Sequence, residues 1–125
     1  MLVETLAAVV VAEVVTDLLK LAIPRSRPDV DTLVARPHTH SFPSGHAAIA
    51  FACATVIGAA VPQARVWLYV LAALVAWSRA YVGVHFPLDV VAGALVGVGL
   101  GLVVLRARRM LAAGRPRSRR SPPAG

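Results

Sequence analysis

Four apolar segments separated by short polar connections constrain this chain of 125 residues more than any other feature. At 1.5 Å rise per residue, each segment approaches the ~17–25 residues that a bilayer-spanning helix needs. The hydrophobic content of 58% exceeds the roughly 45–50% that is typical of soluble domains. We therefore expect an all-α transmembrane bundle of about four spanning helices. The segments run from about Leu2 to Ile23, Gly45 to Val61, Ala64 to Ala80 and Pro87 to Arg106.

The connections predict which helix ends meet. Residues 24–43 are rich in Pro, Arg, Asp and His, and such irregular backbone lies outside the hydrocarbon because lipid offers it no hydrogen bonds. Only Pro62 and Gln63 separate the second and third segments, which makes those helices antiparallel neighbours. The end of the first helix, the start of the second, the end of the third and the start of the fourth then share one membrane face. Most of the unusual polar residues fall on that face: Lys20, Arg25, Arg27, Ser44, His46, Arg79, His85 and Asp89.

Positive charge is concentrated on the opposite face. The chain has thirteen Lys and Arg against six Asp and Glu, and seven of the arginines lie in residues 106–125. The positive-inside rule makes this face cytoplasmic and the polar cluster extracytoplasmic. We expect residues 1–106 to form the membrane domain and residues 107–125 a basic, disordered cytoplasmic tail that contacts anionic headgroups rather than nucleic acid. The bias towards Ala, Val and Arg favours a bacterial plasma membrane.

Two candidate anion sites lie where the first helix ends and the second begins. Lys20 and Arg27 place two cations near one point, and a guanidinium can bind phosphate through paired hydrogen bonds. An isolated pair of this kind is also typical of cations that extend to the membrane interface. Ser44 suits the N-cap of the second helix, whose first amides and dipole attract anions. Gly45 allows a ligand to approach the backbone, and His46 lies in the first turn.

A third cluster joins Arg79 to His85 and Asp89. Pro87 suits the first position of the fourth helix, so His85 immediately precedes that helix and Asp89 lies in its first turn. We expect the Asp89 carboxylate to accept a hydrogen bond from one ring nitrogen of His85, which leaves the other nitrogen as a nucleophile. A purely structural His–Asp pair is the alternative.

Together these groups predict phosphoryl transfer. Cations and helix amides would hold the phosphoryl oxygens, His85 would attack phosphorus, and His46 would protonate the leaving alcohol. This scheme requires no metal ion or cofactor. The rival is a zinc site in which His38 and His40 join His46, but zinc needs three or four ligands and no further ligand motif is evident.

Glu13 and Asp17 are ionisable residues one turn apart within the first apolar segment. Such groups usually face protein or a cavity when they lie at membrane depth. The favoured interpretation is an Asp17–Lys20 pair with Glu13 facing another helix. The alternative is a path for protons or substrate.

Three sequence patterns carry a family resemblance. They are KxxxxxxRP from Lys20 to Pro28, PSGH from Pro43 to His46, and SRxxxxxHxxxD from Ser78 to Asp89. With all three in order, residues 2–106 resemble the type 2 phosphatidic acid phosphatase family, the lipid-phosphatase branch of a superfamily that includes vanadium-dependent haloperoxidases. The resemblance implies a metal-independent helical bundle. It also implies the following roles: His85 as nucleophile, His46 as acid, Asp89 as the partner of His85, and Lys20, Arg27, Ser44, Gly45 and Arg79 as phosphate ligands.

Membrane members of that family usually have six spanning helices, and this sequence matches the last four. We expect a domain without the family's first two helices, and a second copy of the chain is one way to cover the flank that they leave. The predicted function is hydrolysis of a lipid phosphomonoester or diphosphate, of the phosphatidic acid or isoprenoid phosphate class. The alternative is a catalytically silent membrane protein that binds phospholipid, or an assembly subunit with a vestigial phosphate site.

Overall fold

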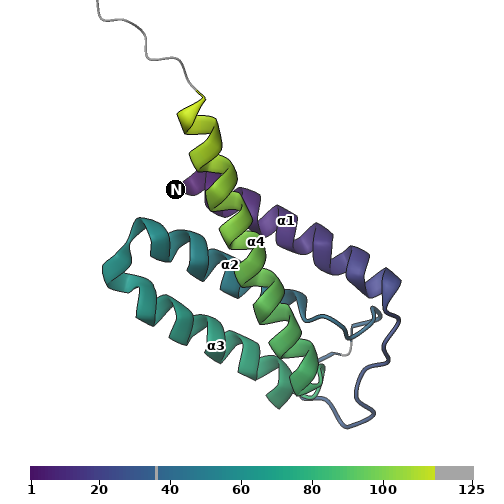
Figure 1. Cartoon of the computed structure of the whole chain (residues 1–125). Coiled ribbons are helices and arrows are strands. Elements are labelled where there is room, and N and C mark those ends of the chain that lie inside the picture. Colours follow the sequence, from purple (N-terminus) through teal and green to yellow (C-terminus); the bar gives the residue numbers. More distant parts are fainter. Residues whose placement is uncertain (36, 115–125) are drawn as a thin grey trace, which may run out of the picture.

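The computed structural model describes residues 1–35 and 37–114, and all the regular elements in this part of the chain are helices. Figure 1 shows four α-helices, with α4 crossing the antiparallel pair α2 and α3. The prediction of an all-helical bundle with four main helices is therefore confirmed. Their bounds are α1 Leu2–Ala22, α2 Gly45–Ala60, α3 Arg65–Tyr81 and α4 Pro87–Ala113, and a single 3₁₀ turn, η1 Pro62–Ala64, joins α2 to α3.

Helix α2 is central because it packs against the other three helices. Its buried side chains are mostly small, and Ala48, Ala52 and Val56 form one core cluster with Ala8 and Ala12 of α1. Small residues let helix backbones approach closely, which is how helices associate where lipid removes the hydrophobic driving force. The core is thus built from close backbone contact rather than from large side chains.

A stripe of glycines brings α4 onto α2. Gly93, Gly97 and Gly101 recur every four residues, so they lie on one face of α4, and all three are buried. A Cβ atom on Gly97 would lie 2.2 Å from the Ala48 carbonyl oxygen, and one on Gly93 would lie 2.4 Å from the Ser44 carbonyl oxygen. No other residue type fits these positions without moving the helices apart.

The fourth helix is longer than predicted. It continues through the arginines at 106, 108 and 109 as far as Ala113, so the expectation of disorder beginning at residue 107 is wrong for residues 107–113. Arginine is a good helix former, and charge by itself does not end a helix. The remainder of the predicted tail, residues 115–125, lies outside the described residues.

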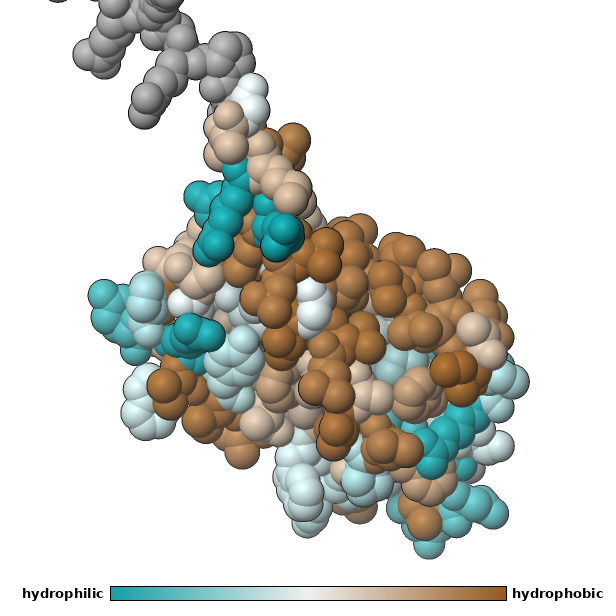
Figure 2. Space-filling view, viewed as in Figure 1, coloured by the Kyte–Doolittle hydropathy of each residue, from teal (hydrophilic) through white to brown (hydrophobic). Residues whose placement is uncertain are grey.

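Apolar side chains cover much of the outer surface. Figure 2 shows them over most of the visible body, with hydrophilic residues gathered towards its ends. The exposed face of α1 carries Leu6, Val10, Val14 and Leu18, each more than half exposed. Within the described residues, α4 alone has both the length and the apolar composition of a membrane-crossing helix. Helices α2 and α3, with 16 and 17 residues, rise by about 24–26 Å.

The glycine stripe gives a direct test of the packing between α2 and α4. We expect Gly97→Ala to destabilise the protein by about 1–3 kcal/mol, the usual cost of overpacking, because the new methyl group meets backbone that cannot yield. Gly99→Ala is the matched control, since a Cβ there has no described neighbour within 4 Å. Thermal unfolding in detergent compares the two variants, and an equal effect of both would contradict this account.

Candidate active site

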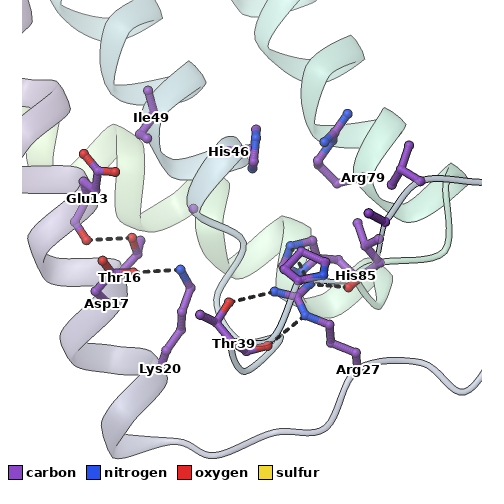
Figure 3. Close-up of a pocket in the computed structure, with 15 residues that line it drawn as sticks. Glu13, Thr16, Asp17, Lys20, Arg27, Thr39, His46, Ile49, Arg79 and His85 are labelled. Atoms are coloured by element: carbon purple, nitrogen blue, oxygen red, sulfur yellow. Dashed lines mark hydrogen bonds and ion pairs between the residues drawn. The ribbon is translucent and has the colours of Figure 1, made fainter. Parts of the chain in front are cut away.

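A cavity of about 540 Å³ opens at the end of the bundle where the long loop meets α1, α2 and α3. Figure 3 shows Lys20 and Asp17 on the α1 side, His46 on α2, Arg79 on α3, and Arg27 beside His85. Eight residues were given catalytic or phosphate-binding roles from the sequence, and six of them line this cavity: Lys20, Arg27, Gly45, His46, Arg79 and His85. The remaining two, Ser44 and Asp89, are fully buried beside it. The folding of the chain thus brings residues from four separate segments together as predicted.

The two ring nitrogens of His85 have different partners, which assigns its tautomer. Nδ1 lies 2.7 Å from the backbone carbonyl oxygen of Ser41, an acceptor, so Nδ1 carries the proton. Nε2 lies 3.3 Å from Nη1 of Arg27, and a guanidinium can only donate, so Nε2 presents its lone pair. Both contacts favour the same neutral form, with Nε2 as the unprotonated nitrogen.

Burial keeps His85 neutral. The side chain is only 5% exposed, and the loss of solvation lowers the pKa of His85 to about 4, with the nearby Arg27 charge adding to the effect. The Ser41 carbonyl and the Asp89 carboxylate act in the opposite direction, but they do not outweigh burial. At neutral pH the ring is therefore uncharged and its lone pair is available.

The expected hydrogen bond between Asp89 and His85 is not the one that the structure contains. Asp89 Oδ2 lies 3.8 Å from His85 Nδ1, which is too long for a hydrogen bond. Oδ2 instead accepts the Phe86 backbone N–H at 2.9 Å, and Oδ1 pairs with Arg25 at 2.8 Å. The carboxylate is held in this way because it caps the start of α4, where the first amides need acceptors.

The start of α2 faces the cavity with free capacity for an anion. The first intrahelical hydrogen bond runs from the Ala48 amide to the Ser44 carbonyl, so the amides of Gly45 and His46 precede the bonded part of the helix. Ser44 occupies the N-cap position as predicted, but its hydroxyl makes no capping bond. Among the described residues nothing partners that buried hydroxyl, so it has hydrogen-bonding capacity for a ligand or a solvent molecule.

The cations of the cavity already have protein partners. Lys20 Nζ pairs with Asp17 Oδ1 at 2.8 Å, as the favoured interpretation predicted, and a Cβ on Gly45 would lie 3.6 Å from the same ammonium. Arg79 Nε donates to the Ser78 hydroxyl at 3.2 Å. Glu13 lines the cavity, which differs from the expectation that it faces another helix.

Arg27 is bound more extensively than the sequence suggested. Its guanidinium donates to the Thr39 carbonyl at 2.8 Å, the Thr39 hydroxyl at 3.1 Å, the His40 carbonyl at 3.3 Å and the Val84 carbonyl at 2.7 Å. With the contact to Nε2 of His85, these bonds engage Nε and both terminal nitrogens. An incoming anion would therefore exchange with some of these acceptors, and it would do so directly in front of His85.

The zinc alternative is not supported by the described residues. His38 and His40 border a shallow groove beside Arg25, whereas His46 lines the deeper cavity. Across residues 1–35 and 37–114, no group of three or more His, Cys, Asp or Glu side chains is placed to hold a metal ion.

Sequence reasoning assigned no role to two residues that shape the surroundings of His85. Ser41 supplies the carbonyl that fixes the tautomer, and Arg25 neutralises Asp89. A backbone carbonyl leaves no trace in residue type, so Ser41 could not have been found. Arg25 carried a weak signal, because it stands among the polar residues of the predicted cluster, two positions before Arg27.

The family sequence model of the PAP2 superfamily matches residues 1–112 of this chain. An undecaprenyl-diphosphatase of Sulfolobus acidocaldarius is 45% identical over 69 residues, which are 52% of this chain and 32% of that protein. A decaprenylphosphoryl-5-phosphoribose phosphatase of Mycobacterium tuberculosis is 36% identical over 101 residues, covering 78% of this chain and 56% of its own length. The chain therefore spans only part of these relatives.

A solved structure is also similar. The crystal structure of a transmembrane PAP2 type phosphatidylglycerolphosphate phosphatase from Bacillus subtilis superposes with a TM-score of 0.78 at 31% identity. The match covers 89% of this chain and 60% of the other. The four-helix arrangement is thus shared with a membrane-embedded protein.

The pKa of His85 can be measured in the free protein. Because burial and Arg27 stabilise the neutral ring, we expect its imidazole to take up a proton near pH 4 rather than near the ~6.5 of an unperturbed histidine. Nitrogen NMR of the protein in detergent follows the titration, with His85→Gln identifying the resonance. A midpoint at or above 6.5 would contradict the described environment.

The Asp17–Lys20 pair should compete with a bound anion. We expect Asp17→Asn to tighten the binding of vanadate by up to about fivefold, the upper end of the range set by an ion pair of ~0.2–1 kcal/mol with one exposed partner. Glu13→Gln removes the same charge from the same cavity without touching Lys20, and it is the matched control. Equal effects of both variants, measured by calorimetry, would show that pairing with Lys20 is not what matters.

Proposed function

The chain belongs to the PAP2 superfamily, and on this premise we propose that it is an integral-membrane phosphatase that hydrolyses a lipid phosphomonoester or diphosphate through a phosphohistidine intermediate. The observation that carries the proposal is the state of His85. Its ring is neutral, its Nδ1 proton is held by the Ser41 carbonyl, and its Nε2 lone pair faces a cationic cavity. A nucleophile held in this way needs no further proton transfer before it attacks.

In the first step, Nε2 of His85 attacks phosphorus and the bond from phosphorus to the lipid oxygen breaks. The phosphoryl group passes to the ring, and the ring's Nδ1–H remains on the Ser41 carbonyl. His46, protonated when substrate is bound, gives its proton to the departing oxygen. The products of this step are a free lipid alcohol, or a lipid monophosphate if the substrate is a diphosphate, and phosphohistidine.

In the second step, water attacks phosphorus and the N–P bond breaks. His46, now unprotonated, accepts the proton of that water, so both histidines return to their starting states. His46 suits both tasks because it lines the same cavity as His85, from the first turn of α2. Inorganic phosphate is then released.

We assign phosphate binding to Lys20, Arg27, Arg79 and the start of α2. Nη1 of Arg27 lies 3.3 Å from the nucleophilic nitrogen, close to where phosphorus must arrive. A phosphoryl oxygen would replace Nε2 as the acceptor of that N–H, which draws substrate to the point of attack. The orphan hydroxyl of Ser44 and the amides of Gly45 and His46 would complete the cradle.

Three cations from separate elements supply the charge neutralisation that phosphoryl transfer needs. We therefore propose that the reaction requires neither a metal ion nor an organic cofactor. We also propose that the cavity faces the outer side of a bacterial plasma membrane. The arginines at 106, 108 and 109 of α4 support this orientation, because the positive-inside rule favours a cytoplasmic position for that end of the bundle.

For the substrate we favour an isoprenoid phosphate or diphosphate. Two of the similar proteins act on polyprenyl lipids by name, an undecaprenyl-diphosphatase and a decaprenylphosphoryl-5-phosphoribose phosphatase. The third acts on phosphatidylglycerolphosphate. The phosphatidic acid class is therefore the second choice.

The proposal predicts phosphate release that depends on His85 and not on added metal. We expect purified protein in detergent to hydrolyse at least one of undecaprenyl diphosphate, undecaprenyl phosphate, phosphatidic acid and phosphatidylglycerolphosphate in the presence of EDTA. His85→Ala should abolish turnover, because the group that forms the covalent bond is gone. His46→Ala should slow turnover by about 10²–10⁴-fold, the usual contribution of a general acid.

Rapid quenching tests the intermediate separately. Substrate labelled in its phosphate should leave acid-labile label on wild-type protein and none on His85→Ala. Activity retained in His85→Ala would refute the nucleophile assignment. Tight vanadate binding without hydrolysis of any of the four lipids would favour the alternative of a silent phospholipid-binding protein.

A further inference from the structure

Arg25 touches both groups that face the Nδ1 side of His85, through two different parts of the residue. Its backbone carbonyl accepts the Ser41 N–H at 2.9 Å. Its guanidinium pairs with Asp89 at 2.8 Å. Ser41 and Asp89 in turn each have an oxygen on the Nδ1 side of His85, at 2.7 and 3.8 Å from that nitrogen. One residue of the long loop therefore joins the N-terminus of α4 to the segment that precedes α2.

The backbone carbonyl of Arg25 helps to fix the position of Ser41. The Ser41 hydroxyl donates to the Ser26 carbonyl at 2.9 Å, and the residue is fully buried. Its amide donates to the Arg25 carbonyl, so the backbone and the side chain of Ser41 are bound by two neighbouring residues of the loop. Together these hydrogen bonds orient the Ser41 carbonyl towards His85.

The guanidinium of Arg25 fixes the position of the Asp89 carboxylate. This carboxylate is fully buried, and an unpaired charge there would be costly. Arg25 supplies the compensating charge to Oδ1, while its guanidinium lies 4.5 Å from the centre of the Phe86 ring. Phe86 donates its own N–H to Oδ2. Both oxygens are thus occupied, and Oδ2 stays out of hydrogen-bonding range of Nδ1.

We propose that Arg25 is a positioning residue for His85. Arg25 holds Ser41 as the sole acceptor of the Nδ1 proton, and it prevents the Asp89 carboxylate from rotating to accept that proton. The expected effect of Arg25 on turnover rests on the proposed function. Its expected effect on the His85 ring does not. Without the guanidinium, Oδ1 is released, the carboxylate is free to rotate, and it competes with the Ser41 carbonyl for Nδ1–H. The ring then tilts, and Nε2 loses its alignment with the cavity.

Charged and titratable groups surround His85 on every side, so the variants must be compared at several pH values. The loop contributes Arg27, α4 contributes Asp89 and α2 contributes His46, all of which act on the His85 charge. Lys20 and Asp17 of α1 and Arg79 of α3 line the same cavity. Removing Arg25 strengthens the influence of Asp89, which favours the protonated ring and moves its titration to higher pH.

The test compares Arg25→Gln with Arg25→Lys and uses Arg65→Gln, at the start of α3, as the control. We expect Arg25→Gln to lower kcat by about 100-fold, as misplacement of a reacting group by about 1 Å does, with little change in KM. Lysine keeps a charge beside Asp89 and should restore part of the loss. Arg65→Gln should match the wild type. In nitrogen NMR, Arg25→Gln should keep the Nδ1–H tautomer, because Ser41 and Asp89 both accept at Nδ1, but it should shift the Nδ1 resonance and raise the titration midpoint of His85.

A double-mutant cycle separates positioning from general damage. If Arg25 acts through Asp89, Arg25→Gln should have a much smaller effect on kcat in the Asp89→Asn background than in the wild type. If Arg25→Gln does not fold, the cycle with Asp89→Asn, which removes the uncompensated charge, and the Arg25→Lys variant carry the test.

Three results would overturn the proposal. They are an unchanged Nδ1 resonance and titration of His85 in Arg25→Gln, additive effects in the cycle, and a raised KM with unchanged kcat, which would make Arg25 a substrate ligand instead. The NMR measurements need no substrate. If the wild-type protein hydrolyses no lipid phosphate, the proposed function fails while the effect of Arg25 on the ring is still decided.

Discussion

The close contact between α2 and α4 is the constraint on which the rest of the structure depends. Gly93 lies against the Ser44 carbonyl, and the Ser44 amide donates to the Asp89 carbonyl at 2.9 Å. The N-termini of two helices are therefore joined at backbone level, with no side chain between them. One N-terminus carries His46 and the other follows His85. Their relative placement is set by the glycines of α4, which lie outside the cavity and have no part in its chemistry.

Electrostatics in the cavity follows from this close packing. The same contact buries Asp89, and burial of a carboxylate demands a cation, which Arg25 provides. Burial also keeps His85 neutral. The remaining cations are paired with groups that an anion would replace: Asp17 for Lys20, and Nε2 of His85 among the acceptors of Arg27. A site arranged in this way is preorganised for an anion because its charges are already in place.

Apolar runs and the flanking prolines predict both ends of each helix to within one residue, except at the end of α4, which continues through the arginines. The predicted cluster of polar residues was found at one end of the bundle because antiparallel threading through short connections leaves few alternatives. The expected hydrogen bond from His85 to Asp89 is absent, and the Ser41 carbonyl accepts it instead. Spacing alone puts Asp89 one turn from His85, but it does not reveal that Arg25 and the Phe86 amide occupy that carboxylate.

The sequence by itself determined which chemical groups are present, on which helix ends they stand, and that those ends meet on one side of the bundle. These follow from periodicity, from chain connectivity and from the three ordered motifs. The tertiary structure alone decided which nitrogen of His85 carries the proton and which acceptor holds it. The physical reason is that a tautomer depends on the atoms within about 3 Å of each ring nitrogen. Here one of those atoms is a backbone oxygen 44 residues away in the chain, which no residue type records.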